Sequence, residues 1–278
     1  MTLDLLTRSV TLRLPFSART FSVTGSANDK SVVGATADAN GIWEPEIMRV
    51  MSEEIGPGHL CLDIGANVGI HTLAMAEIAR HGEVHAFEPS TTTFDYLRKN
   101  VEANGLANVR LHHLGLSNEV GPRQFHNFHE YAGCSVSGEQ SLDADVAGVM
   151  GRAWGVVWEY ATESVHFTTL DRWAAEQGLT RLDFIKMDVE GFERFVLEGG
   201  VETLRRFRPK LITEFNVKAL HAYYGVDPRS YFDLLRSLFA TLSVIKPDGS
   251  TMEVHDFSDL EAQLSAARFW ADLLCRPS

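Results

Sequence analysis

Cysteine is scarce in this 278-residue sequence, and long hydrophobic runs are missing. The three cysteines, Cys61, Cys134 and Cys275, lie far apart and form no CxxC pair, which argues against a disulfide framework and a structural zinc site. No segment approaches the ~18 consecutive apolar residues of a membrane-spanning helix, and the N-terminus lacks the basic-then-apolar pattern of an export signal. We therefore expect a cytoplasmic protein without a membrane span.

Basic residues are also few. The chain carries 25 Lys and Arg against 37 Asp and Glu, a formal net charge of −12, which would repel a phosphate backbone. Nucleic acid is therefore not expected as a partner. With 45% hydrophobic and 22% charged residues, and with no repeat or low-complexity tract, the composition is typical of one enlarged globular domain.

The first 42 residues carry the signals of β-strands. Apolar and polar side chains alternate in residues 9–14, and residues 20–23 can supply a partner strand. Apolar residues at helical spacing follow in residues 45–54, before a Gly-Pro-Gly turn. We predict a β-rich N-terminal extension over residues 1–42 and a main domain over residues 43–278.

From residue 59 onward, short apolar runs alternate with helix-sized segments, among them a helix expected over residues 192–206. Strands that are buried on both faces and separated by helices predict an α/β fold with a doubly wound, parallel sheet. Residues 242–245 and 251–254 flank a Pro-Asp-Gly turn and predict a terminal β-hairpin, which would add an antiparallel strand.

Residues 121–165 interrupt this rhythm between two expected strands. The segment has no clear period and is rich in aromatic and histidine side chains, namely Phe125, His126, Phe128, His129, Tyr131, Trp154, Trp158 and Tyr160. In an open α/β sheet, ligands bind outside the carboxyl ends of the strands, so an insertion there can form a substrate lid. The alternative is a surface subdomain with a small core of its own.

A glycine-containing turn follows the first core strand, in the run Asp63-Ile64-Gly65-Ala66-Asn67-Val68-Gly69. Gly65 permits close approach of the backbone to a ligand, Asn67 tolerates a positive φ, and Gly69 allows close packing of helix and strand. A dinucleotide site would prefer G-x-G-x-x-G, whose amides face a pyrophosphate. The carboxylate of Asp63 would repel a pyrophosphate but attract the ammonium of an aminoacyl cofactor such as S-adenosylmethionine.

A second acid, Glu88, ends the next expected strand, 25 positions after Asp63. This offset is close to the ~20 residues at which an acid on the second strand binds ribose hydroxyls. Either acid alone could be a helix-capping or solvated carboxylate. Two acids on successive strand ends, with the glycine turn between them, favour a site for S-adenosylmethionine.

The sequence resembles the FkbM family of S-adenosylmethionine-dependent methyltransferases between residues 43 and 216. The matching segments, in family order, are Trp43-Glu44-Pro45, Asp63 to Gly69, Phe87-Glu88-Pro89, Thr169-Leu170-Asp171, Phe184 to Gly191 and Pro209 to Glu214. The Lys-x-Asp-Val-Glu-Gly run is the most family-specific, whereas the glycine turn alone indicates only a class I methyltransferase. The resemblance implies a Rossmann-like, mostly parallel seven-stranded sheet and methylation of a hydroxyl on a sugar or natural product.

Acids at strand ends are the candidates for chemistry. Methyl transfer is an in-line displacement, so the protein must align the acceptor oxygen and, for an alcohol, remove its proton. Asp188 and Glu214 end successive expected strands and are predicted to act as base and orienter, or to hold a divalent cation. Glu190 is either a third catalytic acid or a carboxylate suited to the positive end of the next helix.

Other positions complete the expected cleft. Ser117 is predicted to approach the adenine edge, or to belong to an ordinary strand-end turn. Trp43 and Glu44 either close the methionine end of the pocket or attach the N-terminal segment to the core. Lys186 is assigned a structural role, and the histidines of the insertion are alternative bases because their pKa lies near working pH.

The favoured interpretation is an O-methyltransferase that acts on a small polyhydroxylated acceptor. An NAD-dependent dehydrogenase would share the sheet and Glu88 but is disfavoured by Asp63 and Asn67 in the turn. A non-catalytic protein that keeps the fold and the pocket is the third alternative, and the retained acids at both sets of strand ends argue against it.

Overall fold

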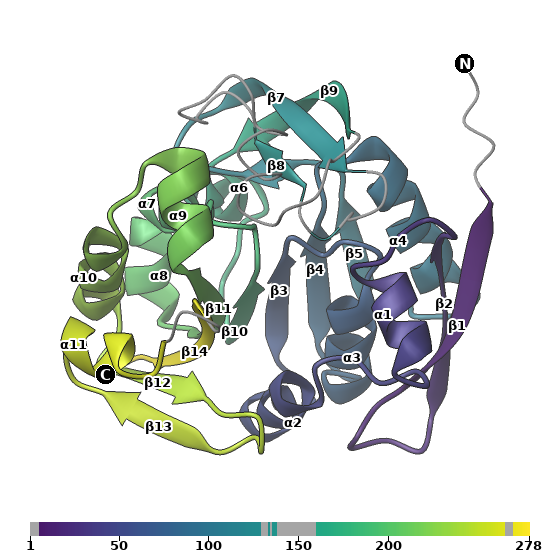
Figure 1. Ribbon diagram of the computed structural model, residues 1–278, viewed down its shortest axis with the longest axis horizontal. Coiled ribbons are helices and arrows are strands. Elements are labelled where there is room, and N and C mark those ends of the chain that lie inside the picture. Colours follow the sequence, from purple (N-terminus) through teal and green to yellow (C-terminus); the bar gives the residue numbers. More distant parts are fainter. Residues whose placement is uncertain (1–5, 129–132, 134, 138–159, 265–268) are drawn as a thin grey trace.

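The structure is a computed structural model that describes residues 6–128, 133, 135–137, 160–264 and 269–278. An eight-stranded sheet runs through its centre in the order β13-β12-β14-β11-β10-β3-β4-β5 (Figure 1). These strands are β3 (Leu60–Ile64), β4 (Glu83–Phe87), β5 (Val109–His112), β10 (Phe184–Met187), β11 (Lys210–Asn216), β12 (Thr241–Ile245), β13 (Thr251–Val254) and β14 (Trp270–Arg276). The five strands from β11 to β5 are parallel, and β14 is antiparallel to both of its neighbours.

Helices cover both faces of this sheet. They are α1 (Val33–Asp38), α2 (Pro45–Glu54), α3 (Ile70–Ile78), α4 (Thr91–Ala103), α6 (Leu170–Glu176), α7 (Glu193–Glu198), α8 (Val201–Phe207), α9 (Val217–Tyr224), α10 (Pro228–Leu238) and α11 (Phe257–Glu261). Successive side chains of β3, Cys61 and Leu62, belong to two different hydrophobic clusters, as expected when alternate residues face opposite sides. The cluster at Cys61 includes α2 to α4, and the cluster at Leu62 includes α6 to α11. None of the helices described is long and apolar enough to cross a membrane.

The order of the parallel strands creates a crevice beside β3. The chain passes from β3 to β4 and β5 on one side, then returns to place β10 and β11 on the other side. Adjacent strands β3 and β10 therefore lead into connections that diverge at their carboxyl ends. This is the position at which open α/β sheets bind their ligands.

The α/β prediction is confirmed, but two details differ. The sheet has eight strands instead of seven, because β14 inserts between β11 and β12 in addition to the predicted β12–β13 hairpin. The helix expected over residues 192–206 is two helices, α7 and α8, separated at Gly199 and Gly200. A side chain at Gly199 would place its Cβ 2.0 Å from the Ser117 carbonyl oxygen, so this close packing requires glycine between the two helices.

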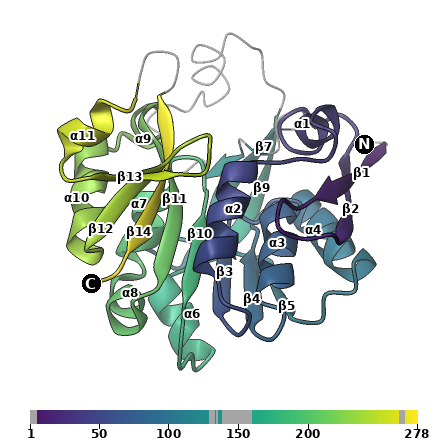
Figure 2. The same cartoon turned by 90° about the horizontal axis from the view of Figure 1, so that it is seen from below.

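The N-terminal extension contains the predicted hairpin, β1 (Thr7–Arg13) and β2 (Thr20–Ser26), followed by α1. It packs beside α4, at the opposite end of the molecule from β13 (Figure 2). Asn100 of α4 donates to the Thr24 carbonyl oxygen at 2.9 Å, and Asn104 Oδ1 accepts from Ser22 N at 2.9 Å. A boundary at residue 42 between two separate domains stays a prediction.

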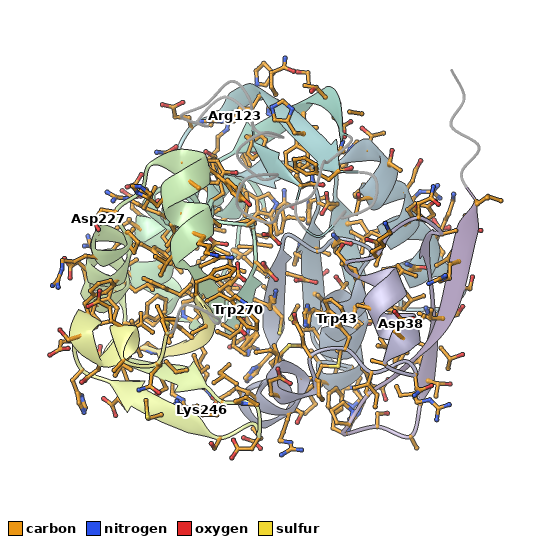
Figure 3. The ribbon with its side chains drawn as sticks, in the orientation of Figure 1. Asp38, Trp43, Arg123, Asp227, Lys246 and Trp270 are labelled. Atoms are coloured by element: carbon orange, nitrogen blue, oxygen red, sulfur yellow. The ribbon has the colours of Figure 1, made fainter. Side chains whose placement is uncertain are left out.

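A second sheet occupies the expected insertion, where the sequence shows no clear period. Its order is β6-β9-β7-β8, from β6 (Gly115–Leu116), β7 (Gly121–Phe128), β8 (Val136–Ser137) and β9 (Tyr160–Thr168). Figure 3 places Arg123 of β7 at one end of the molecule and Lys246, after β12, at the other. The aromatic positions Tyr131, Trp154 and Trp158, with His129, lie outside the described residues.

Candidate functional site

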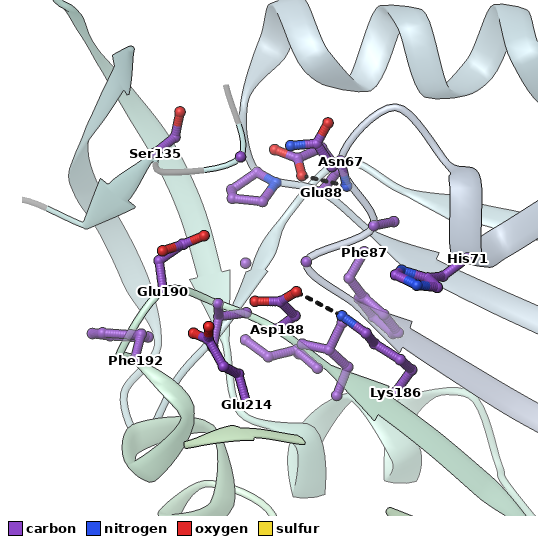
Figure 4. Close-up of a pocket in the computed structure, with 18 of the residues that line it drawn as sticks. Asn67, His71, Phe87, Glu88, Ser135, Lys186, Asp188, Glu190, Phe192 and Glu214 are labelled. Atoms are coloured by element: carbon purple, nitrogen blue, oxygen red, sulfur yellow. Dashed lines mark hydrogen bonds and ion pairs between the residues drawn. The ribbon is translucent and has the colours of Figure 1, made fainter. Parts of the chain in front are cut away.

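A cavity of about 280 Å³ opens at the carboxyl ends of β3, β4, β10 and β11 (Figure 4). The second sheet and the N-terminal extension supply its other walls. Its lining includes Val32, Trp43, Glu44, Gly65, Asn67, His71, Glu88, Leu116, Phe125, Phe167, Lys186, Asp188, Glu190, Phe192 and Glu214. Nearly all the acids that the sequence singles out therefore meet in one place.

The glycine turn after β3 forms one wall. Gly65 has φ +82°, and a side chain there would place its Cβ 1.9 Å from the Asp188 carbonyl oxygen. Asn67 has φ +51°, and Gly69, at φ +96°, opens α3 with its Cα close to the Leu97 side chain. The positive φ angles of the turn therefore require glycine or asparagine, which the sequence supplies. The turn also exposes its backbone to the cavity.

Glu88 is fixed against this turn. Its Oε2 accepts a hydrogen bond from Asn67 N at 3.0 Å and its Oε1 accepts one from Ser90 N at 2.8 Å. Only 6% of the residue is exposed, and burial raises the pKa of Glu88 to about 7 although both N–H groups oppose the shift. Each oxygen keeps a free acceptor site for a hydroxyl that enters the cavity.

Asp63 lies below the turn and is not among the residues that line the cavity. It is 1% exposed, and its Oδ2 accepts a hydrogen bond from Thr72 Oγ1 at 2.5 Å. Its Oδ1 is buried and has no hydrogen-bond partner in the described part of the chain. Burial raises the pKa of Asp63, with His71 and Lys186 opposing the shift.

Asp188 forms a partly buried ion pair with Lys186, whose Nζ lies 2.7 Å from Asp188 Oδ2 (Figure 4). Burial disfavours the charge on each partner, but their attraction dominates, so the pKa of Asp188 is lowered and the pKa of Lys186 is raised. The Lys186 side chain is 4% exposed, and the residue also lines the cavity. Lys186 therefore keeps Asp188 ionised at the cavity floor.

Glu190 and Glu214 lie on the other side of Asp188 in the same cavity (Figure 4). Burial raises the pKa of both well above its usual range, and the negative charge of Asp188 adds to the shift. Glu214 Oε2 is buried and has no hydrogen-bond partner among the described residues. Burial and the neighbouring charge of Asp188 therefore disfavour the ionised forms of both groups, and a bound cation would favour them.

Two further acids, Glu193 and Asp272, were not selected from the sequence. Burial raises the pKa of Glu193 to about 7 and that of Asp272 to about 8. Asp272 lies opposite Glu214 in the β11–β14 ladder. Asp188, Glu193 and Glu214 each bring one carboxylate oxygen within 4.8 Å of the others, so these three could hold a metal ion. The sequence offered one signal for Glu193: it is an acid that follows Glu190 by three positions, at the start of the next helix.

Trp43 and Glu44 line the cavity at the start of α2. Glu44 has φ +36°, and its Oε2 lies 3.1 Å from Nε2 of His71 on α3. This pairing turns the Glu44 carboxylate toward the cavity wall that α3 provides. Both residues line the pocket, and whether they close it or attach the N-terminal segment to the core stays a prediction.

Ser117 does not line the cavity. It is fully buried, and its hydroxyl lies 3.3 Å from Asn118 Oδ1. The cavity is lined instead by Leu114, Gly115 and Leu116 of the same segment. The segment reaches the pocket as predicted, but Ser117 is not part of the lining, and its N–H donates to the Thr168 carbonyl oxygen of β9 at 2.9 Å.

The N-terminal extension also reaches the cavity, which the sequence did not indicate. Ser31 and Val32 line it beside Gly133, whose N–H donates to Ser31 Oγ at 3.0 Å. Asp29 holds this turn, because its carboxylate accepts hydrogen bonds from Ser31 and from the N–H groups of Val32 and Val33. The extension is therefore part of the pocket wall.

Comparison with known proteins places this site in context. The model of the methyltransferase FkbM domain matches residues 63–267. The 2-O-methyltransferase NoeI of Sinorhizobium fredii is 30% identical over 211 residues, which cover 72% of this chain and 82% of that protein. The 31-O-demethyl-FK506 methyltransferase FkbM of Streptomyces tacrolimicus is 31% identical over 163 residues, which cover 52% of this chain and 61% of that protein.

Among solved structures, precorrin-6y C5,15-methyltransferase of Geobacter metallireducens matches with a TM-score of 0.43 and 11% identity. The match covers 84% of this chain and 89% of that chain.

Proposed function

This chain belongs to the methyltransferase FkbM domain family, and we propose that it methylates a hydroxyl oxygen of a small polyhydroxylated acceptor, such as a sugar, a glycosylated metabolite or a natural product. As a family member it is an S-adenosylmethionine-dependent methyltransferase. The printed names of the two relatives, a 2-O-methyltransferase and a 31-O-demethyl-FK506 methyltransferase, support an oxygen acceptor. The observation that carries the proposal is the single cavity that joins the glycine turn and Glu88 to Asp188, Glu190 and Glu214.

The residues of the turn suit S-adenosylmethionine. Glu88 offers a fixed carboxylate to the ribose hydroxyls, and the positive φ angles at Gly65 and Asn67 bring backbone close to the cavity. The unpartnered Oδ1 of Asp63 is a buried acceptor behind the turn, and its carboxylate form would attract the methionine ammonium directly or through water. Glu44 would close that end.

Bound S-adenosylmethionine supplies an electrophilic methyl group. The protein then has to align the acceptor oxygen and take its proton as the new bond to carbon forms and the bond from carbon to sulfur breaks. Asp188, kept ionised by Lys186, would accept a hydrogen bond from the acceptor hydroxyl and orient it. Glu190 and Glu214 are better proton acceptors once ionised, because their pKa is raised.

Calorimetric titration with S-adenosylmethionine, S-adenosylhomocysteine and NAD tests the cofactor assignment. We expect the first two to bind and NAD not to bind. Glu88→Ala and Asp63→Ala should each weaken binding by about one to two decades, since a charge-assisted hydrogen bond contributes ~1.5 to 3 kcal/mol. Glu102→Gln, at an exposed position of α4, is the control. Unchanged affinity in both folded alanine variants would sink the assignment.

Transfer of a labelled methyl group to a panel of sugars and glycosylated metabolites tests the reaction. Hydroxyl-bearing acceptors should gain the label, and their deoxy analogues should not. A protein that binds the cofactor but labels no acceptor would support the non-catalytic alternative. The dehydrogenase alternative is not favoured, because the family match is to methyltransferases.

A further inference from the structure

Three carboxylates from three different elements converge beside the floor of the cavity: Asp188 and Glu214 line it, and Glu193 is buried next to them, outside the lining. Asp188 follows β10, Glu193 opens α7, and Glu214 lies in β11 beside β10. One carboxylate oxygen of each lies within 4.8 Å of the others. In Figure 4 one Asp188 oxygen faces Lys186, and the other faces the side on which Glu190 and Glu214 lie.

A tight turn brings Asp188 and Glu193 together although they are five positions apart. Glu190 and Gly191 both have positive φ, at 57° and 91°. The turn curls around the Glu193 carboxylate, whose Oε1 accepts hydrogen bonds from Val189 N at 3.0 Å and Gly191 N at 3.3 Å. Because the backbone holds Oε1, the position of the whole carboxylate is fixed before any ligand arrives.

The other oxygen of Glu193 lacks a partner. Glu193 is 0% exposed, and its Oε2 has no hydrogen-bond partner among the described residues. Oε2 of Glu214 is also buried and has no hydrogen-bond partner among the described residues. A buried oxygen without a hydrogen-bond partner destabilises the fold, so each such group in a native structure needs an explanation. Within the described residues, one member of this trio has a basic partner: Lys186 forms an ion pair with Asp188 Oδ2.

We propose that Asp188, Glu193 and Glu214 bind one divalent cation, Mg²⁺ or Mn²⁺. Hard cations take carboxylate oxygens, and ligand atoms at about 2.0–2.6 Å from an ion lie within about 5 Å of one another, as these do. The cation satisfies the free oxygens of Glu193 and Glu214. Asp188 keeps one oxygen for Lys186 and offers the other.

The site deepens the proposed function and rests on it for its role. A cation at the cavity floor would lower the pKa of an acceptor hydroxyl placed there. The hydroxyl proton then passes to Glu190, the neighbouring carboxylate that lines the cavity outside the trio. The oxygen forms its bond to the methyl carbon, and the bond from that carbon to sulfur breaks.

Titration of the chelator-treated full chain with Mn²⁺, followed by calorimetry and by electron paramagnetic resonance, tests the inference without cofactor or acceptor. We expect one Mn²⁺ per chain. Glu193→Gln and Glu214→Gln should each weaken binding at least tenfold. The glutamine amide oxygen at 193 can still accept the bonds from Val189 N and Gly191 N, so this variant removes charge and keeps the turn. Glu202→Gln, at an exposed position of α8, should bind like the wild type.

Absence of saturable one-site binding to the wild-type chain overturns the inference, as does wild-type affinity in both folded variants. If one variant does not fold, the wild-type chain and the other variant decide. Cofactor titration separates the two proposals. Normal S-adenosylmethionine binding without Mn²⁺ binding removes the cation and leaves the function, whereas the reverse result removes the function and leaves the cation site.

Discussion

Backbone strain concentrates at the cavity. Five non-glycine residues in the described part of the chain have positive φ, and three of them, Glu44, Asn67 and Glu190, line this pocket. Such conformations cost roughly 1–3 kcal/mol each and persist only where surrounding contacts enforce them. Here His71 pairs with Glu44, and Glu88 accepts from Asn67 N. The chain therefore holds its carboxylates in place at a cost in stability, as expected of a functional site.

The raised pKa of Glu88 makes cofactor affinity depend on pH. Burial moves this pKa to about 7, so the group is mostly ionised at pH 8 and mostly protonated at pH 6. A carboxylate accepts hydrogen bonds from ribose hydroxyls better than a neutral carboxyl does. We expect affinity for S-adenosylmethionine to fall about tenfold from pH 8 to pH 6 in calorimetric titrations. Glu88→Gln should bind more weakly with a flatter profile, and a flat wild-type profile contradicts the assignment.

Asp188→Asn should lower turnover by ~10²- to 10⁴-fold and leave cofactor affinity nearly unchanged. The asparagine oxygen can still accept the hydrogen bond from Lys186, so the fold should be kept. The change removes the negative charge that faces the acceptor substrate. Steady-state rates with an identified acceptor measure the effect. Asp183→Asn, which precedes the same strand at its other end, is the matched control. Near-normal turnover in the Asp188→Asn, Glu214→Gln double variant would refute the catalytic assignment.

Strand ends explain which residues could be predicted from the sequence. Asp188 follows β10 directly. Glu214 does not end its strand as predicted, because β11 continues to Asn216 beside β14, but it is the first residue of β11 beyond the pairing with β10. The parallel sheet therefore still brings both positions to one edge. Glu88 follows from the same rule. The burial of Asp63 beneath the turn could not be predicted, because it depends on contacts with Thr72 and His71 from the next helix. Nor could the role of Glu193, which depends on the curl of the turn before it.

At the scale of elements, pairing between distant segments limited the prediction. The parallel strands and their helices have local periodic signals, so their order along the chain could be predicted. Strand β14 carries Asp272 inside a short apolar run, and its partners β11 and β12 precede it by tens of residues. Strands β7 and β9 pair across 31 residues that separate them, so their partnership has no local signal.

The second sheet is predicted to contribute to the acceptor pocket. Phe125 of β7 lines the cavity, whereas Phe128 of the same strand is buried outside the lining. Phe125→Ala should raise KM for the acceptor by about tenfold and leave cofactor affinity unchanged, because an aromatic face that packs on the acceptor is lost. Phe128→Ala is the matched control and should change stability more than KM. Equal KM values for wild type and Phe125→Ala would exclude this wall as an acceptor contact.

At the scale of the whole molecule, the central cavity carries an excess of acid. The formal net charge is −12, and several buried carboxyls have a raised pKa because burial disfavours their charge. Glu54 is an exception with a lowered pKa: burial opposes its ionisation, but Arg276 and Lys210 outweigh that effect and connect α2 to β14 and β11. Among the acids of the cavity, Asp188 has Lys186 as its partner. For Glu190 and Glu214 we propose that bound cations, the sulfonium of the cofactor or the inferred metal ion, offset the charge.

This imbalance predicts that the ligand-free protein is less stable at pH 8 than at pH 6.5. The pKa of Glu88 and of Glu193 is about 7 in the folded chain, above the usual value, so the folded state binds more protons than the unfolded state and stability falls as pH rises. These two groups should lower the free energy of unfolding by on the order of 1–2 kcal/mol, or about 2–6 °C in melting temperature. Below pH 6.5 His112, whose pKa burial lowers to about 4, acts in the opposite direction, because its unfolded state binds the extra proton. One histidine offsets only part of the effect of the two glutamates, so stability should rise less steeply from pH 6.5 to pH 5.5. Thermal unfolding followed by circular dichroism at pH 5.5, 6.5 and 8 measures the profile. The Glu88→Gln, Glu193→Gln double variant should lose the part of the decline above pH 6.5 that these two groups cause, and Asp272, whose pKa is about 8, should maintain the rest. Saturating S-adenosylmethionine should stabilise the wild type more at pH 8 than at pH 6.5. A wild-type melting temperature that rises between pH 6.5 and 8 would show that these carboxyls are already ionised in the free protein.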